Sequence, residues 1–347
     1  MTESNQNIEP EDNTPKRLLS LDLFKGITII LVVFVNTVGQ FDSTPAWTRH
    51  APDFGLTYVD LVAPFFVFMM ALNYKSSFQR HLEATNRSKT YIKFLQRYLI
   101  FLGLGLFLCI DVDPAGNFYF RWGTLQVLGV SGLILLPLII FPAIVRLFIG
   151  LGGLLLHQSL LETSLKQVIY DGIEGGVWAS LSWGSMLILS SVLAEGLYKY
   201  LKKGNENTQK TMTLYFLLGG IVFVIMGIVT NSLFLINFNW VISRQYMTAS
   251  YVLISTGISS LVFYFLYYCI EILGKDHRLF QKDNFISVLG RNSFFLFIIH
   301  IVLITLSIPL IPVNSHLIVV FMLGFINVLI IWLLGFYMYK GEVFIVV

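Results

Sequence analysis

Charge is scarce in this sequence: Asp, Glu, Lys and Arg make up 12% of its 347 residues, against about 25% in a typical soluble domain. Hydrophobic residues make up 56%, and they come in long blocks rather than in amphipathic stripes. Soluble globular domains and disordered chains are therefore excluded. A membrane β-barrel is excluded as well, because its strands alternate apolar and polar residues. The composition predicts an all-α, polytopic integral membrane helix bundle.

Cysteine is nearly absent. Cys109 and Cys269 both lie in apolar runs, so we expect small buried side chains, with neither a disulfide nor a metal site. The first 16 residues are polar and acidic and lack the apolar stretch of a cleavable signal peptide. We expect residues 1–16 to form a disordered cytoplasmic tail and residues 17–347 to form a single transmembrane domain.

A transmembrane helix needs about twenty predominantly apolar residues. Windows of this kind predict about ten spans, near residues 19–37, 58–78, 94–111, 123–142, 144–161, 178–198, 212–231, 248–270, 292–312 and 316–338. Only a short turn around Pro142 and Arg146 separates the fourth span from the fifth. We therefore expect these two spans to form a tight helical hairpin.

Lys and Arg are distributed unevenly between the predicted loops. With a cytoplasmic N-terminus, 19 of the 23 lie in inner segments, and only Arg49, Arg121, Lys166 and Arg244 lie outside. Because cytoplasmic loops are enriched in Lys and Arg, both termini are predicted to be cytoplasmic. The four outer cations lie among several carboxylates. Such a mixture suits a polar ligand such as a sugar, but it is also typical of solvated loops.

The densest polar region spans residues 17–66. Arg17, Asp22 and Lys25 lie at its inner end, where they form either a helix-start ion pair or a cationic site for phosphates at the cytoplasmic mouth. Asn36 lies near the outer end of the first apolar span. An amide inside a membrane needs partners and so faces the bundle interior. It would either join two helices or hold a carbonyl group.

Two histidines stand out. His50 lies in the predicted outer loop after the first span, with Asp53 and Asp60 nearby. Histidine suits general base catalysis near neutral pH, and the alternative is an ordinary surface side chain. His300 lies deep in the ninth span, where an ionisable residue is a candidate for function.

A long ordered pattern runs from Arg17 through Val35-Asn36 and His50-Ala51 to Asp60-Leu61-Val62-x-Pro64-x-Phe66. It resembles the lysosomal heparan-α-glucosaminide N-acetyltransferase family and its bacterial relatives. The family pattern Arg-x-x-Ser-Leu-Asp-x-Phe-Arg-Gly is matched by residues 17–26, with Lys25 in place of Arg. Shorter similarities follow in four segments: Arg121 to Gln126, Asp171 to Gly175, Arg244 to Gly257, and Gly290 to His300, which contains Asn292.

The resemblance implies transfer of an acetyl group from cytoplasmic acetyl-CoA to the amine of an amino sugar or glycan on the outer side. His50 and Asn36 inherit the catalytic roles: His50 would accept the proton of the amine, and Asn36 would stabilise the thioester oxygen. An acetyl-histidine intermediate is the alternative use of the same ring. The supporting or substrate-binding residues would be Asp60, Asp53, Arg49, Arg121, Arg244, Asn292 and His300, and those for acetyl-CoA would be Arg17, Asp22, Lys25 and Gln126.

Further expectations follow for partners and location. Arg80 and Arg97 are additional candidates for the CoA phosphates. The partners would be acetyl-CoA, the acceptor and the lipid bilayer, which would be that of a bacterial cytoplasmic (inner) membrane. We expect no nucleic acid and no metal. A homodimer is left open.

The sequence also departs from the family pattern, at Lys25, Asp53, Ala63 and Val127. These departures favour an acceptor other than heparan sulfate. Two alternatives stay open: a polar-solute transporter or exporter, although no repeat or pair of broken helices is evident, and a family member without catalysis.

Overall fold

The computed structural model describes residues 18–112, 116–274 and 284–345. Arg17 and the predicted tail at residues 1–16 lie outside this part of the chain. The helices are α1 (Leu19–Val38), α2 (Val62–Ala84), α3 (Arg87–Leu108), α4 (Thr124–Leu135), α5 (Ala143–Leu160), α6 (Leu165–Asp171), α7 (Gly176–Leu193), α8 (Glu195–Lys203), α9 (Glu206–Thr213), α10 (Gly219–Ser232), α11 (Ala249–Tyr267), α12 (Ser287–Arg291), α13 (Ser293–Ser307) and α14 (Leu317–Lys340). A short antiparallel ribbon pairs β1 (Ile110–Val112) with β2 (Phe118–Phe120).

The prediction of an all-α polytopic bundle is confirmed. In the described part of the chain, nine helical segments are long and apolar enough to cross a membrane. The fourth predicted span is shorter than expected, because α4 has only 12 residues and a bilayer needs about twenty. Cys109 and Cys269 are free, as expected, but both are half-buried rather than fully buried.

The predicted hairpin between the fourth and fifth spans is wrong. Helix α4 packs on α3 and α7, whereas α5 packs on α7. The reason lies on the face of α5: a Cβ added at Gly150 would lie 2.8 Å from the Leu189 side chain of α7, so glycine allows the two helices to approach closely. Arg146, predicted to lie in a loop, is fully buried on the same face and donates to Ser191 Oγ at 2.6 Å and to Glu195.

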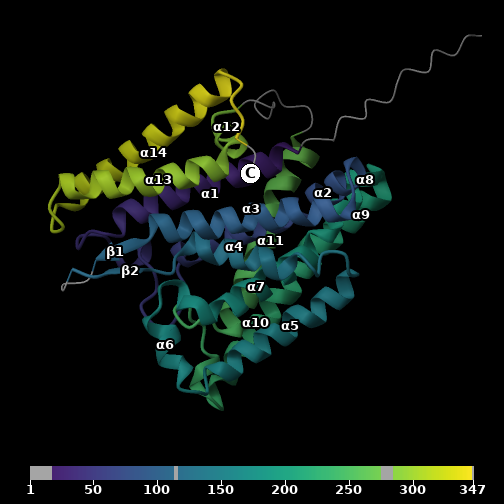
Figure 1. The fold of residues 1–347 in the computed structure, drawn as a ribbon, viewed down its shortest axis with the longest axis horizontal. Helices are drawn as coiled ribbons and strands as arrows, with labels where there is room; N and C mark the ends of the chain where they lie inside the picture. Colours follow the sequence, from purple (N-terminus) through teal and green to yellow (C-terminus); the bar gives the residue numbers. More distant parts are fainter. Residues whose placement is uncertain (1–17, 113–115, 275–283, 346–347) are drawn as a thin grey trace, which may run out of the picture.

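Helix α1 lies in the interior of the bundle and contacts α2, α11, α12, α13 and α14 (Figure 1). Its approach to α12 is very close. A Cβ at Gly26 would lie 2.1 Å from the Ile286 carbonyl oxygen, and a Cβ at Gly290 would lie 2.2 Å from the Asp22 carbonyl oxygen. Only glycine fits at these two positions. Gly26, the last residue of the 17–26 pattern, therefore has a packing role.

The bundle has two ends with different content. The β1–β2 ribbon and α6 lie at one end, and α8 and α9 lie at the other (Figure 1). Helices α1 and α14 are antiparallel neighbours, with Phe34 against Phe321 and Phe325. The start of α1 and the end of α14 therefore lie at the same end of the bundle, as two cytoplasmic termini would require.

Candidate functional site

A cavity of about 430 Å³ opens at the end of the bundle that carries the β1–β2 ribbon. We call it the outer cavity. Its lining brings together polar side chains that are far apart in the sequence: Asn36, His50, Arg121, Glu174 and His300. Four of these five were singled out by the sequence as candidate site residues.

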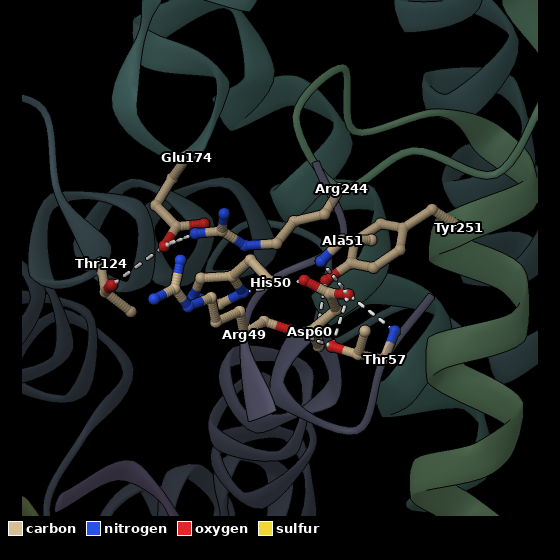
Figure 2. A network of polar contacts seen from close by, with 9 residues as sticks. All are labelled: Arg49, His50, Ala51, Thr57, Asp60, Thr124, Glu174, Arg244 and Tyr251. Carbon is tan, nitrogen blue, oxygen red and sulfur yellow. Dashed lines mark hydrogen bonds and ion pairs between the residues drawn. The ribbon is translucent and has the colours of Figure 1, made fainter. Parts of the chain in front are cut away.

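His50 is held by Asp60. The ring Nδ1 lies 2.8 Å from Asp60 Oδ1, and the His50 side chain is 43% exposed while that of Asp60 is fully buried. Because a carboxylate only accepts hydrogen bonds, this contact assigns the proton to Nδ1 and leaves Nε2 as an acceptor. Figure 2 shows the imidazole beside this carboxylate.

The second carboxylate oxygen of Asp60 is held by the surrounding loop. It accepts from the backbone N–H groups of Thr57 at 2.8 Å and Ala51 at 3.2 Å, and Tyr251 donates its hydroxyl proton to the Asp60 carbonyl at 2.7 Å. Arg49 also stabilises this loop, because its guanidinium donates a hydrogen bond to the Phe41 carbonyl. These contacts hold the Asp60 carboxylate in one orientation, and in that orientation it positions the His50 ring (Figure 2).

Asn36 and His300 form a second pair on the cavity lining. Asn36 Nδ2 lies 3.3 Å from His300 Nε2, and the other ring nitrogen of His300 contacts the Phe297 carbonyl. That carbonyl can only accept, so it assigns the proton of His300 to Nδ1 and makes Nε2 the acceptor for the Asn36 amide. His300, which lies more than 250 residues further along the chain, thus holds the Asn36 side chain in place.

Two ion pairs border the outer cavity. Arg244 Nη2 lies 2.6 Å from Glu174 Oε1, and Arg121 Nη1 lies 3.0 Å from Asp111 Oδ2. Burial lowers the pKa of Arg244, but Glu174, Tyr251 and Asp60 together outweigh this effect and raise it, so the guanidinium stays charged. Hydrogen bonds from the Val112 N–H and from Arg121 lower the pKa of Asp111. The positive and negative charges around the cavity therefore balance locally.

Three residues predicted for the site lie elsewhere. Asp53 accepts from the Tyr170 hydroxyl at 2.8 Å on the outer surface, and that bond raises the pKa of Tyr170. Gln126 is fully buried and caps the start of α4, where its Oε1 accepts from Gly123 N–H at 3.0 Å. Asn292 bonds the backbone at Val343 and Ile345 at the opposite end of the bundle. Each of these three side chains makes hydrogen bonds that stabilise the local structure around it.

At the other end of the bundle, two adjoining cavities of about 570 and 280 Å³ share Lys25, Asn73 and Arg80. We call them together the inner cavity. Asp22 and Lys202 line its larger part. Among the described residues, four cations and no carboxylate line its smaller part: Lys25, Arg80, Arg97 and Arg291. All of them belong to the segments predicted to be cytoplasmic.

The inner and outer cavities meet at two aromatic rings. Phe66 of α2 and Phe297 of α13 line both the outer cavity and the smaller part of the inner one, and their ring centroids are 4.6 Å apart. Arg291, the last residue of α12, lies on the inner side of this pair, and His300 of α13 lies on the outer side. The two rings therefore mark the level at which the cavities are separated.

Sequence reasoning missed several lining residues. Glu174 and Trp122 line the outer cavity and Arg291 the inner one. Glu174 carried a signal, since it lies in the segment 171–175 that resembles the family, but its partner Arg244 is 70 residues away. Within residues 18–112, 116–274 and 284–345, no group of three or more His, Cys, Asp and Glu side chains is arranged to hold a metal ion.

The fold and these cavities define a polytopic helical membrane protein with a His–Asp pair at one end and a cationic cavity at the other. Residues 17–112 match a family described as "Domain of unknown function (DUF5009)". Heparan-alpha-glucosaminide N-acetyltransferase from Homo sapiens is 50% identical over 56 residues, which is 16% of this chain and 8% of the human protein. The chain thus matches a small part of that relative's length, and the two proteins are distantly related.

Proposed function

We propose that this protein is a membrane-bound acyltransferase that moves the acetyl group of acetyl-CoA, bound from the cytoplasmic side, to an amine on the outer side. The observation that carries the proposal is the arrangement of the two cavities. An oriented His50 borders the outer cavity, and the Phe66–Phe297 pair lines both this cavity and a cavity lined by four cations.

The chemistry follows from the two side-chain pairs. A neutral amine attacks the thioester carbonyl carbon, a C–N bond forms, the C–S bond breaks, and CoA leaves as a thiolate that takes up a proton. His50 Nε2 accepts the proton lost by the amine nitrogen, and Asp60 stabilises the imidazolium that results. Asn36 donates a hydrogen bond to the carbonyl oxygen as negative charge develops on it.

The inner cavity suits the phosphate-bearing part of CoA. Phosphates bind arginine side chains through charge-assisted hydrogen bonds, and Arg97 Nε is buried without a hydrogen-bond partner in the described part of the chain. Along α1, Asn36 lies 11 positions after Lys25, which corresponds to about 17 Å of helix. An extended acyl-carrying arm that moves the two rings apart would cross this distance and present the thioester to His50.

Proteoliposomes test the proposal directly. Acetyl-CoA is supplied on the side of the inner cavity and glucosamine on the opposite side, and N-acetylglucosamine is measured by mass spectrometry. We expect the product only when both substrates are present, and we expect His50→Ala to abolish it in a protein that still inserts and folds. Glucosamine flux without acetyl-CoA, and no acetylated product from any amine, would instead indicate a transporter.

The acceptor is an amine on a sugar or glycan in this proposal, and the membrane is the bacterial cytoplasmic membrane. Support for a sugar comes from the outer cavity, whose lining combines paired charges with amide, hydroxyl and indole groups. Support for the membrane side comes from the cations that line the inner cavity.

A further inference from the structure

Two polar atoms in the wall of the outer cavity have no hydrogen-bond partner among the residues that the structure describes. They belong to two residues that line this cavity: the indole Nε1 of Trp122, which can only donate, and Oε2 of Glu174, which can only accept when ionised. Both atoms are buried, and Glu174 as a whole is 7% exposed. Buried polar groups in proteins are nearly always paired, so an unpaired donor and an unpaired acceptor beside one cavity suit a ligand that can pair with both.

The position of Glu174 is fixed by contacts that leave Oε2 available. Its other oxygen pairs with Arg244 at 2.6 Å, and its carbonyl accepts from Trp183 Nε1 at 3.1 Å. The residue has φ 54°, a left-handed conformation that is unfavourable for a residue with a side chain. Backbone strain of this kind is concentrated at functional sites. Figure 2 shows Glu174 between Thr124 and Arg244, near the His50 ring.

The chemistry of the wall points to one class of ligand. A hydroxyl group both donates and accepts, so it satisfies an indole N–H and a carboxylate oxygen at once. The charges of Glu174 and of Arg121 are each balanced by a partner, which removes the attraction that would select a phosphate or another anion. The volume of about 430 Å³ lies within the range of roughly 300–1,000 Å³ typical of small-molecule sites.

We infer that Trp122 and Glu174 recognise the hydroxyl groups of the acceptor and make the protein selective for hydroxylated amines, that is amino sugars, over plain alkyl amines. The inference rests on the proposed function for the role of the amine, but it concerns binding alone. Trp122 donates to one hydroxyl oxygen, Glu174 accepts from a hydroxyl proton, and the amine is left for His50.

Binding measurements without acetyl-CoA test this inference separately from catalysis. Purified protein in detergent is titrated with glucosamine and with cyclohexylamine, which keeps a six-membered ring and the amine but has no hydroxyl group, and the affinity is measured by calorimetry. We expect the unmodified protein to bind glucosamine more tightly. Trp122→Phe keeps an aromatic ring and removes only the N–H donor, and we expect it to weaken glucosamine binding about 10-fold, as the loss of one buried hydrogen bond does.

Two further variants complete the design. Trp178→Phe makes the same chemical change at a tryptophan of α7 that is 48% exposed, and it should leave glucosamine binding unchanged. Glu174→Gln should also weaken glucosamine binding, but it leaves Arg244 without its carboxylate, so Trp122→Phe is the decisive variant if the Glu174 variant does not fold. Neither substitution at the cavity should change the affinity for cyclohexylamine.

The outcomes separate the two proposals. Equal affinity of the unmodified protein for both amines, or unchanged glucosamine affinity in Trp122→Phe, would overturn the inference even if acetyl transfer is observed. Selective glucosamine binding that Trp122→Phe removes would support it even if no acetyl transfer is found, and in that case the proposed acyltransferase function alone would fail.

Discussion

Replacing Asp60 with asparagine changes the proton position on His50 while keeping the shape of the side chain. Asp60 Oδ1 faces His50 Nδ1, and Oδ2 faces the backbone N–H groups of Thr57 and Ala51. Asparagine has only one acceptor oxygen. If that oxygen stays with the two backbone donors, the new NH₂ group faces His50 and makes Nδ1 an acceptor, so the proton moves to Nε2. A ring protonated at Nε2 cannot take the proton of the amine.

The size of the effect follows from this geometry. General base catalysis contributes about 10²–10⁴-fold, and a wrong histidine tautomer in a comparable His–Asp pair removes about 10⁴-fold. We therefore expect Asp60→Asn to lower kcat by about 10²–10⁴-fold. The KM for each substrate should change little, because Asp60 is fully buried behind His50. The lost charge-assisted bonds should also destabilise the fold by about 1–3 kcal/mol.

The assay is acetyl transfer from acetyl-CoA to glucosamine, with the N-acetylated product measured by mass spectrometry and the fold monitored by thermal unfolding. His50→Ala provides the matched control. If Asp60 acts through His50, the double variant Asp60→Asn, His50→Ala should be no slower than His50→Ala alone. A folded Asp60→Asn protein with nearly unchanged kcat, or a double variant whose defect equals the product of the two single defects, would refute the positioning role of Asp60.

Three other predictions concern separate parts of the path. Asn36→Ala should lower kcat about 10²-fold or more, as the loss of an oxyanion donor does, and an unchanged kcat would remove Asn36 from the reaction. The double variant Arg80→Gln, Arg97→Gln should raise the KM for acetyl-CoA at least about 10-fold with little effect on kcat, whereas Arg87→Gln, an α3 cation outside the inner cavity lining, should have no effect. In a Cys269→Ala background, Phe66→Ala should let a membrane-impermeant thiol reagent applied from the inner side label Cys109, which lines the outer cavity, several-fold faster. Unchanged labelling would show that the ring pair is not the barrier.

The architecture was predictable from the sequence where local composition decides the structure. Long apolar runs fixed the helices, and the uneven distribution of Lys and Arg placed Lys25, Arg80 and Arg97 at the same end of the bundle, where they line the inner cavity. The hairpin between the fourth and fifth spans was wrong because the small residues of α5 fit α7 instead. Sequence proximity predicts such a partner poorly, since helix packing depends on surface shape.

The same distinction applies to the site. His50 and Asp60 are only ten residues apart, so their proximity could be predicted from the sequence. Glu174 and Arg244 are separated by 70 residues, so nothing local indicated their pairing. Gln126 is a different case: its segment resembles the family, which suggested a role in binding acetyl-CoA, and in the structure its amide caps α4.

The contact between Phe66 and Phe297 also bears on the membrane as an electrical barrier. A protein that passes an acyl group through a bilayer holds water-accessible cavities on both sides, and a continuous column of water between them would conduct protons. Two apolar rings at 4.6 Å interrupt such a column, because they offer no hydrogen-bonding group to a water chain. In the proposed function, Phe66, the last residue of the 17–66 sequence pattern, therefore lies where acyl transfer must proceed without a leak of protons driven by the membrane potential.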